Sequence, residues 1–170
     1  EARKLAARVS KFPLDEDGKR HFVVCSGGGP SFMEAADRGA HDVGEESIGL
    51  NIVLPHEQLP NNYVTPDLSF QFHYFALRKM HFLLRARAVA VFPGGFGTFF
   101  EVFGLFTLIQ TGKVRPLPIL LFGREFWERV VDFQGLAEEG VISPHDLDLI
   151  TWVETAEEAW DAVCEHYEVC

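Results

Sequence analysis

Short apolar runs alternate with helical segments along the whole chain, and this alternation restricts the fold more than any other feature of the sequence. The runs are rich in valine, isoleucine, leucine and phenylalanine, which is typical of buried strands. We expect strands at 21–25, 47–54, 68–72, 88–92, 117–122 and 149–153, and helices at 2–10, 31–43, 74–87, 98–111, 125–139 and 156–167. Strands and helices that alternate at this spacing form a parallel sheet with helices on both faces, so the sequence predicts an α/β fold of three layers.

The length and composition indicate one globular domain. The chain has 170 residues, of which 47% are hydrophobic and 24% charged, and these values are ordinary for a soluble protein with a sizeable core. We therefore expect residues 1–170 to form a single domain. The formal net charge of −10 and the lack of any lysine or arginine run argue against DNA or RNA as a partner, although a cleft can still bind a small anion.

The cysteines indicate a reduced, cytoplasmic protein. Cys25, Cys164 and Cys170 form no CxxC pair and their number is odd, so we expect neither a disulfide framework nor a zinc site. No other spacing of metal ligands is present, and we expect no metal. No apolar stretch is long enough to span a membrane and no signal peptide is visible, so we expect no contact with a membrane.

Three glycines lie where the predicted strand at 88–92 passes into the predicted helix at 98–111. They are Gly94, Gly95 and Gly97, and we call residues 94–97 the second glycine turn. Backbone N–H groups at such a turn, together with the positive end of the helix, can hold a phosphate group. Because Glu101 follows in what we expect to be the first turn of the helix, the segment indicates chemistry on a phosphorylated small molecule.

A second cluster of glycines, at residues 27–29, follows the predicted strand at 21–25, and we call it the first glycine turn. It does not fit the dinucleotide-binding pattern, because Phe32 stands at the third glycine position and no acidic residue ends the next strand. No Walker-type motif is present either. Glycines also serve ordinary tight turns, but two clusters at the carboxyl edge of one parallel sheet favour a shared anion site.

Glu101 could have a structural role instead of a functional one. Glu101 could close a capping box with Thr98, or it could face the ligand. A carboxylate near a helix N-terminus is favoured in its ionised form, so Glu101 suits a base or an electrostatic partner better than a general acid.

Arg78 and Lys79 lie in the apolar helix predicted at 74–87, where they could occupy a solvated edge. A guanidinium also suits bidentate contact with phosphate or carboxylate, so Arg78 could bind the substrate or orient Glu101. Lys79 has no context that supports a Schiff base. His73 and His81 are more typical of core or surface positions than of a site.

Several segments together resemble the LONELY GUY (LOG) family, formerly labelled "possible lysine decarboxylase". The resemblance runs from about Phe22 to the C-terminus. The segments are GGGP at 27–30, MEAA at 33–36, RGA at 38–40, SIGLNI at 47–52, LPHE at 54–57, the pair Arg78–Lys79 and PGGFGTFFE at 93–101. An Arg–Lys pair followed by PGGxGTxxE is the signature of the family, and both parts are present.

The resemblance implies a Rossmann-like, doubly wound fold and a nucleoside 5′-monophosphate phosphoribohydrolase. Such an enzyme cleaves the N-glycosidic bond of AMP or of cytokinin ribotides and releases the free base and ribose 5-phosphate. Arg78 and Glu101 match the catalytic residues of the family. The residues expected to bind substrate and phosphate are Gly28, Gly29, Lys79, Gly94, Gly95, Phe96, Gly97 and Thr98. Members are usually homodimers with sites near the subunit interface, and we expect no cofactor.

Other functions and two departures from the family stay open at this point. A non-catalytic nucleotide or cofactor carrier on the same fold would keep the glycine turns and would not need the Arg78–Glu101 pair, whereas an amino-acid decarboxylase gains no support. The strand and Gly-Ser-rich loop that begin the family fold are absent, so we expect the first strand to be missing from this chain. Ser31 stands where many members have glycine. We expect the loop at 56–67 and a partner chain to form the base pocket.

Overall fold

The computed structural model describes residues 1–54 and 59–170, which form two compact units, Glu1–Arg85 (unit 1) and Ala86–Cys170 (unit 2). The first glycine turn and Arg78 belong to unit 1, whereas the second glycine turn and Glu101 belong to unit 2. The two units are therefore described in turn.

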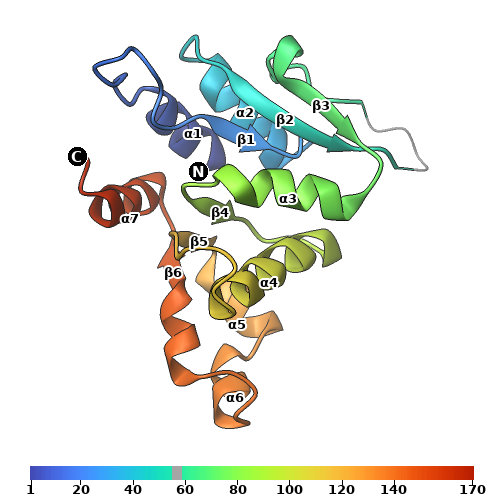
Figure 1. Cartoon of the computed structure of the whole chain (residues 1–170), viewed down its shortest axis with the longest axis vertical. Helices are drawn as coiled ribbons and strands as arrows, with labels where there is room; N and C mark the ends of the chain where they lie inside the picture. Colours follow the sequence, from blue (N-terminus) through green and yellow to red (C-terminus); the bar gives the residue numbers. More distant parts are fainter. Residues whose placement is uncertain (55–58) are drawn as a thin grey trace. The chain divides into compact units, whose positions relative to one another are not determined.

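Unit 1 contains a parallel sheet of three strands. Its elements are α1 (Ala2–Ser10), β1 (Val24–Ser26), α2 (Phe32–His41), β2 (Ser47–Ile52), the short 3-10 helix η1 (Pro66–Leu68), β3 (Ser69–Phe72) and α3 (Phe75–Arg85). The strand order is β1-β2-β3 (Figure 1). Cys25 lies beside Ile48, and Leu50 lies beside Phe70. Because all three strands are parallel, their carboxyl ends share one edge, and the first glycine turn follows β1 at that edge.

Small residues allow α1 and α2 to pack closely. Gly39 of α2 lies so near α1 that a Cβ atom there would meet the carbonyl oxygen of Arg3. Leu5, Ala6 and Ala40 are buried. Burial of this apolar side accounts for the stability of a helix as short as α1.

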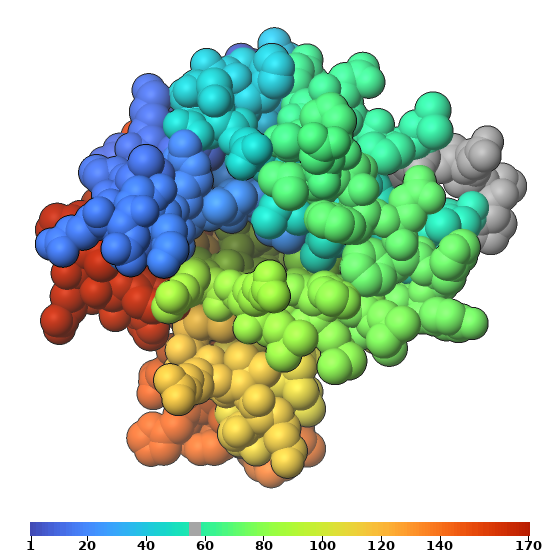
Figure 2. All heavy atoms as spheres, turned by 45° about the horizontal axis from the view of Figure 1, so that its top comes forward, coloured from blue at the N-terminus to red at the C-terminus, as the bar shows by residue number. Residues whose placement is uncertain are grey.

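The helix α3 contrasts with α1, since none of its side chains is buried. Leu77, Met80 and Leu84 are 52, 55 and 73% exposed, and atoms of α3, coloured green, reach the surface in Figure 2. Its sequence is nevertheless apolar over much of the helix circumference. The fold of unit 1 by itself therefore does not account for the apolar character of this helix.

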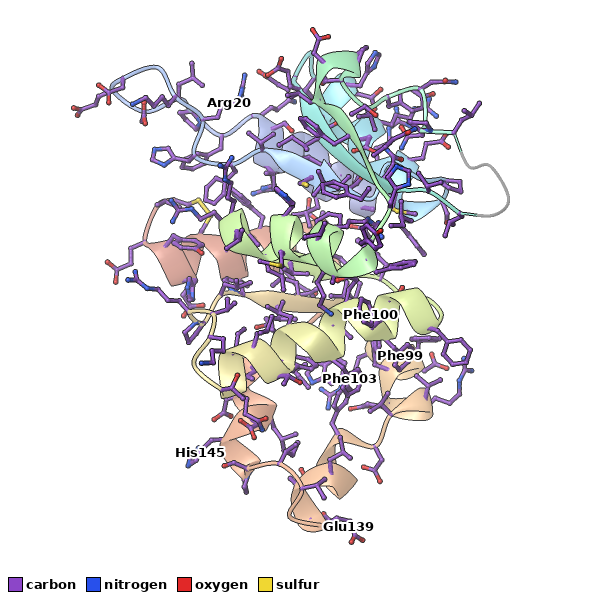
Figure 3. The ribbon with its side chains drawn as sticks, turned by 45° about the vertical axis from the view of Figure 1, so that its right-hand side comes forward. Arg20, Phe99, Phe100, Phe103, Glu139 and His145 are labelled. Carbon is purple, nitrogen blue, oxygen red and sulfur yellow. A yellow bond between two sulfur atoms is a disulfide. The ribbon has the colours of Figure 1, made fainter. Side chains whose placement is uncertain are left out.

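Unit 2 repeats the parallel arrangement around a more aromatic core. Its elements are β4 (Val89–Val91), α4 (Phe96–Gln110), β5 (Ile119–Phe122), α5 (Arg124–Val130), α6 (Phe133–Glu138), the 3-10 helix η2 (Pro144–Leu149), β6 (Ile150–Val153) and α7 (Ala156–Tyr167). The strand order is β4-β5-β6, and all four residues of β5 are buried. Phe99 and Phe103 lie along α4 (Figure 3), with ring centroids 5.9 Å apart, and Phe103 also stacks on Phe133 of α6.

The predicted α/β class with parallel strands is confirmed, with differences at some ends. The strand expected at 21–25 is shorter and lies at Val24–Ser26. The helix expected at 125–139 is divided into α5 and α6, because Val131 is extended and Asp132 caps the second piece by accepting a hydrogen bond of 2.7 Å from Gly135 N–H. An aspartate three residues before that donor is a typical start of a helix.

The prediction that the cysteines form no disulfide is wrong for two of the three. Cys164, in the last turn of α7, is bonded to Cys170, with their Cα atoms 5.3 Å apart. Glu168 ends α7 in the left-handed conformation, which turns the chain back toward the helix and brings Cys170 within reach. Among the helices that the structure describes, none is both long and apolar enough to cross a membrane.

Candidate functional site

The first glycine turn is held by hydrogen bonds inside unit 1. The hydroxyl of Ser26, the last residue of β1, donates to a carboxylate oxygen of Asp37 at 2.7 Å. The same hydroxyl accepts a hydrogen bond of 2.8 Å from the N–H of Gly28. Because this N–H is used within the protein, Gly28 presents no free donor to a phosphate, and its binding role stays a prediction.

Asn61 holds the other side of this turn. Its backbone N–H donates to the carbonyl of Gly28 at 2.8 Å, and its side-chain amide donates to the carbonyl of Gly29 at 3.0 Å and to Asp37 at 2.7 Å. Its side-chain oxygen accepts from the N–H of Tyr63 at 3.0 Å. These bonds fix the turn from within unit 1, and they use the N–H of Gly28, which is therefore not available to an anion.

Packing disfavours a side chain at Gly28 and leaves little room for one at Gly27. A Cβ atom on Gly28 would meet the side-chain amide of Asn51, and Gly28 has a φ of 68°, which favours glycine. A Cβ atom on Gly27 would meet the guanidinium of Arg78. At Gly28 the structural interpretation of the glycine is sufficient.

Arg78 is anchored beside this turn. Its Nε–H donates to the carbonyl of Leu50 in β2 at 2.7 Å, and its guanidinium carbon lies 5.2 Å from the centre of the Phe82 ring. Arg78 is partly buried, so the alternative of a solvated edge is wrong. The structure thus brings Arg78 and Gly27 together, while the neighbouring Lys79 is half-buried in the same helix.

The second glycine turn enters its helix earlier than the sequence predicts. The first residue of α4 is Phe96, with Gly95 as N-cap, because the N–H groups of Thr98 and Phe99 both donate to the carbonyl of Gly95, at 3.0 and 3.1 Å. Thr98 is therefore inside the helix and cannot cap it, so the capping box is wrong. Glu101 lies in the second turn and not the first, which weakens its interaction with the helix dipole.

The glycines of this turn are not all required by the protein. A Cβ atom on Gly94 would meet the hydroxyl of Thr98, but one on Gly95 or Gly97 would meet nothing within 4 Å. Neither Gly95 nor Gly97 has a positive φ. Phe96 between them is 96% exposed.

The N–H groups of this turn are also open. Within residues 1–54 and 59–170, no hydrogen bond engages the backbone N–H groups of residues 94–97. The first N–H groups of a helix have no partner inside the helix, and a phosphate oxygen can supply one. The second glycine turn therefore has the chemistry of an anion site.

Three residues near the first turn were not identified as site residues from the sequence. Asp37 and Asn51 are buried, and Asn61 is partly buried. The available signal was a polar residue in an apolar context, namely Asp37 in a helix that packs on α1 and Asn51 inside the apolar strand β2. Burial raises the pKa of Asp37 above its ordinary value, and the hydrogen bonds from Asn61 and Ser26 oppose that shift.

The backbone of Ser31 is strained where the chain leaves the first turn. Its φ is 65° and its ψ is −123°, a conformation that favours glycine, and its hydroxyl makes no capping hydrogen bond to α2. Glycine would adopt this conformation without strain. In the loop at 56–67, residues 56–58 lie outside the described residues, as does most of the LPHE segment, so only Asn61 and its neighbours can be placed.

Comparison with solved structures confirms the fold. Three structures of the molybdenum cofactor carrier protein from Chlamydomonas reinhardtii match 98% of this chain, with TM-scores of 0.63, 0.62 and 0.58. They are 20, 18 and 17% identical to it, and the match covers 86, 85 and 85% of their own chains. The chain thus has the Rossmann-like α/β fold of these proteins. A comparison with curated proteins gave no match.

The family follows from the sequence match. The model of the family described as "possible lysine decarboxylase" matches residues 33–163, which include Asp37, Arg78, Glu101 and the second glycine turn. This match covers most of the chain. The protein therefore belongs to the LOG family, the family labelled "possible lysine decarboxylase".

Proposed function

We propose that the protein hydrolyses the N-glycosidic bond of a nucleoside 5′-monophosphate, either AMP or a cytokinin ribotide, to the free base and ribose 5-phosphate. The observation that carries the proposal is the open second glycine turn. Gly95 and Gly97 are required neither by backbone conformation nor by packing, and the N–H groups of residues 94–97 are available to an anion. Glycines that the protein itself does not require are expected where a ligand approaches the backbone closely.

The proposed roles follow from the chemistry of glycoside hydrolysis. The second glycine turn and Thr98 hold the 5′-phosphate at the start of α4, and Lys79 adds positive charge. Gly28 and Gly29 border the substrate site in this proposal, although the N–H of Gly28 is bonded to Ser26 and does not bind the phosphate. Cleavage develops positive charge on the ribose, so an ionised Glu101 would stabilise that charge or activate water. Acid–base and electrostatic effects of this kind each contribute roughly 10²- to 10⁴-fold in rate.

Arg78 supplies fixed positive charge in this proposal. A guanidinium remains protonated at every relevant pH, so it acts by holding a substrate oxygen or the Glu101 carboxylate and not by donating a proton. Its hydrogen bond to the carbonyl of Leu50 restricts its orientation before any ligand binds. Such preorganisation lowers the entropic cost of reaching a reactive geometry.

The test is an assay of both products. Purified protein is incubated with AMP and, separately, with an isopentenyl-adenine ribotide, and the free base and ribose 5-phosphate are quantified. We expect equal amounts of both products, and loss of most activity in Glu101→Gln while its circular dichroism is unchanged. Release of neither product from either substrate would refute the proposed reaction.

A second candidate is a non-catalytic nucleotide or cofactor carrier. The observation in its favour is that the three matching structures, which share the fold of this chain, are all of a molybdenum cofactor carrier protein. A carrier would bind a nucleotide at the same turn without turnover. Tight binding of AMP by calorimetry together with no product release would select the carrier.

The remaining parts of the proposal concern organisation and location. We propose that residues 1–170 act as one nucleotide-monophosphate-binding domain and that the protein forms a homodimer, to which the exposed apolar residues of α3 give support. Light scattering coupled to size-exclusion chromatography tests the dimer. We also propose a cytoplasmic location, in which Cys164 and Cys170 would be kept reduced. Alkylation of thiols at the moment of cell lysis tests that location.

A further inference from the structure

A fully buried carboxylate lies behind the first glycine turn. Asp37 has 0% of its surface exposed, although it lies on α2, where neighbouring polar residues reach solvent. Burying an acid is costly unless hydrogen bonds compensate for it. Two hydrogen bonds of 2.7 Å, from Ser26 and Asn61, end on one of its oxygens. Packing alone would be served better by an apolar residue, so these hydrogen bonds are the reason for an acid here.

The carboxylate determines how both of its neighbours are oriented. An ionised carboxylate can only accept, so the hydroxyl of Ser26 must donate to it, and this leaves the hydroxyl oxygen to accept from Gly28 N–H. In the same way, one hydrogen of the Asn61 amide is directed to Asp37 and the other to the Gly29 carbonyl. Asp37 thereby fixes both sides of the first glycine turn.

This turn in turn supports Arg78. The guanidinium lies against Gly27, in the space that a side chain would occupy, and its Nε–H is bonded to the carbonyl of Leu50. The turn and β2 thus hold the guanidinium from two directions. A shift of the turn would remove the packing of the guanidinium against Gly27 and leave its hydrogen bond to the carbonyl of Leu50.

We propose that Asp37 is a positioning residue, which orients Arg78 by fixing the first glycine turn through Ser26 and Asn61. The inference rests on the proposed function for the reaction that Arg78 serves, but the contact chain from Asp37 to Arg78 can be tested without any reaction. Asp37 itself touches neither the substrate nor Glu101 in this proposal.

The first measurement needs no substrate. Solvent exchange of the Arg78 Nε–H, whose hydrogen bond to Leu50 protects it, is followed by NMR in the wild type, Asp37→Ala and Asp37→Asn. We expect exchange to be faster on the order of tenfold in Asp37→Ala, because the guanidinium gains freedom. We expect little change in Asp37→Asn, whose side-chain oxygen can still accept both hydrogen bonds. Unchanged exchange in a folded Asp37→Ala would overturn the inference.

The second measurement is a double-mutant cycle on kcat/KM. We expect Asp37→Ala to lower kcat/KM on the order of 10- to 100-fold in the wild type, but to have almost no further effect in Arg78→Ala, because both changes act through one guanidinium. Equal effects in both backgrounds would show that Asp37 does not act through Arg78. If Asp37→Ala does not fold, Ser26→Ala interrupts the same contact chain and takes its place in both measurements.

Leu5→Ala in the buried side of α1 is the matched control. It also destabilises unit 1, but it lies on a different helix from both Asp37 and Arg78 and outside the contact chain of Ser26 and Asn61, so kcat/KM and the exchange of Arg78 Nε–H should stay at wild-type values. If Leu5→Ala lowered kcat/KM and the protection of Arg78 Nε–H as much as Asp37→Ala does, general destabilisation of unit 1 would explain both variants. That result would refute the inference. If the wild type cleaves neither substrate, the proposed function fails, and the exchange measurement still decides the role of Asp37.

Discussion

The two glycine turns have similar sequences, and each follows a parallel strand. The physical reasons for having glycine, however, differ between the two turns. In the first turn Gly28 is needed by the protein, because it has a positive φ and lies against Asn51, and Gly27 leaves the space that the guanidinium of Arg78 occupies. In the second turn Gly95 and Gly97 meet nothing, and the N–H groups are open. A glycine-rich turn at a strand end can therefore be a support for a side chain or a binding surface for a ligand.

Gly28→Ala gives the largest effect that this comparison predicts. The new Cβ atom would meet the Asn51 amide and place alanine at a positive φ. We expect a loss of about 3 kcal/mol in the free energy of unfolding, the sum of overpacking and backbone strain. Urea denaturation measures it.

Gly44→Ala is the matched control for Gly28→Ala. Gly44 also has a positive φ, of 78°, but a Cβ atom there would meet nothing within 4 Å. It should lose only the backbone part, about 1 kcal/mol. Equal losses in the two variants would show that packing at the first turn contributes nothing.

Gly97→Ala should separate stability from function. Alanine fits the space and is favoured in a helix, so we expect the free energy of unfolding to be unchanged or higher by up to about 1 kcal/mol. We expect kcat/KM to fall on the order of 100-fold, because the methyl group would occupy the surface that the phosphate approaches. Denaturation and the product assay give the two values. A variant that is fully active would remove the main support for a phosphate site at residues 94–97.

The contrast between the turns also shows which parts of the fold and of the candidate site can be predicted from the sequence. The alternation of apolar strands and helical segments predicted the α/β class, and motif matching selected Arg78 and residues 94–97 as candidate site residues. The start of α4 was not predictable, because whether Phe96 and Gly97 join the helix depends on the two hydrogen bonds that end on Gly95. The role of Asp37 was not predictable either, since its hydrogen-bond partner Asn61 comes from a distant loop. The Cys164–Cys170 bond depended on the backbone reversal at Glu168.

Asp37→Asn tests the cost of the buried acid behind the first turn. Burial raises the pKa of the Asp37 carboxyl in the folded protein. The folded protein therefore keeps the proton of this carboxyl at a pH where the unfolded chain, in which the pKa is about 4, has released it. Ionisation therefore lowers stability as pH rises from about 4 through the raised pKa, and the full penalty persists above it. Asparagine does not ionise, so the stability of the variant relative to wild type should increase over that range. Urea denaturation of both proteins between pH 4 and 8 checks this, and parallel curves would contradict it.

Ser31→Gly, at the exit of the first turn, should give the smallest effect and the opposite sign. Relief of strain at its φ of 65° is worth roughly 1–3 kcal/mol, and the greater freedom of glycine in the unfolded chain offsets about 1 kcal/mol of that gain. No capping hydrogen bond is lost, because the Ser31 side chain makes none to α2. We expect a net gain of about 1 kcal/mol in urea denaturation, whereas Ser31→Ala should give none because alanine keeps the strain. If Ser31→Gly and Ser31→Ala had the same effect on the free energy of unfolding, the backbone at Ser31 would not be strained. Backbone conformation at the exit of the first turn would then not contribute to the choice of residue there.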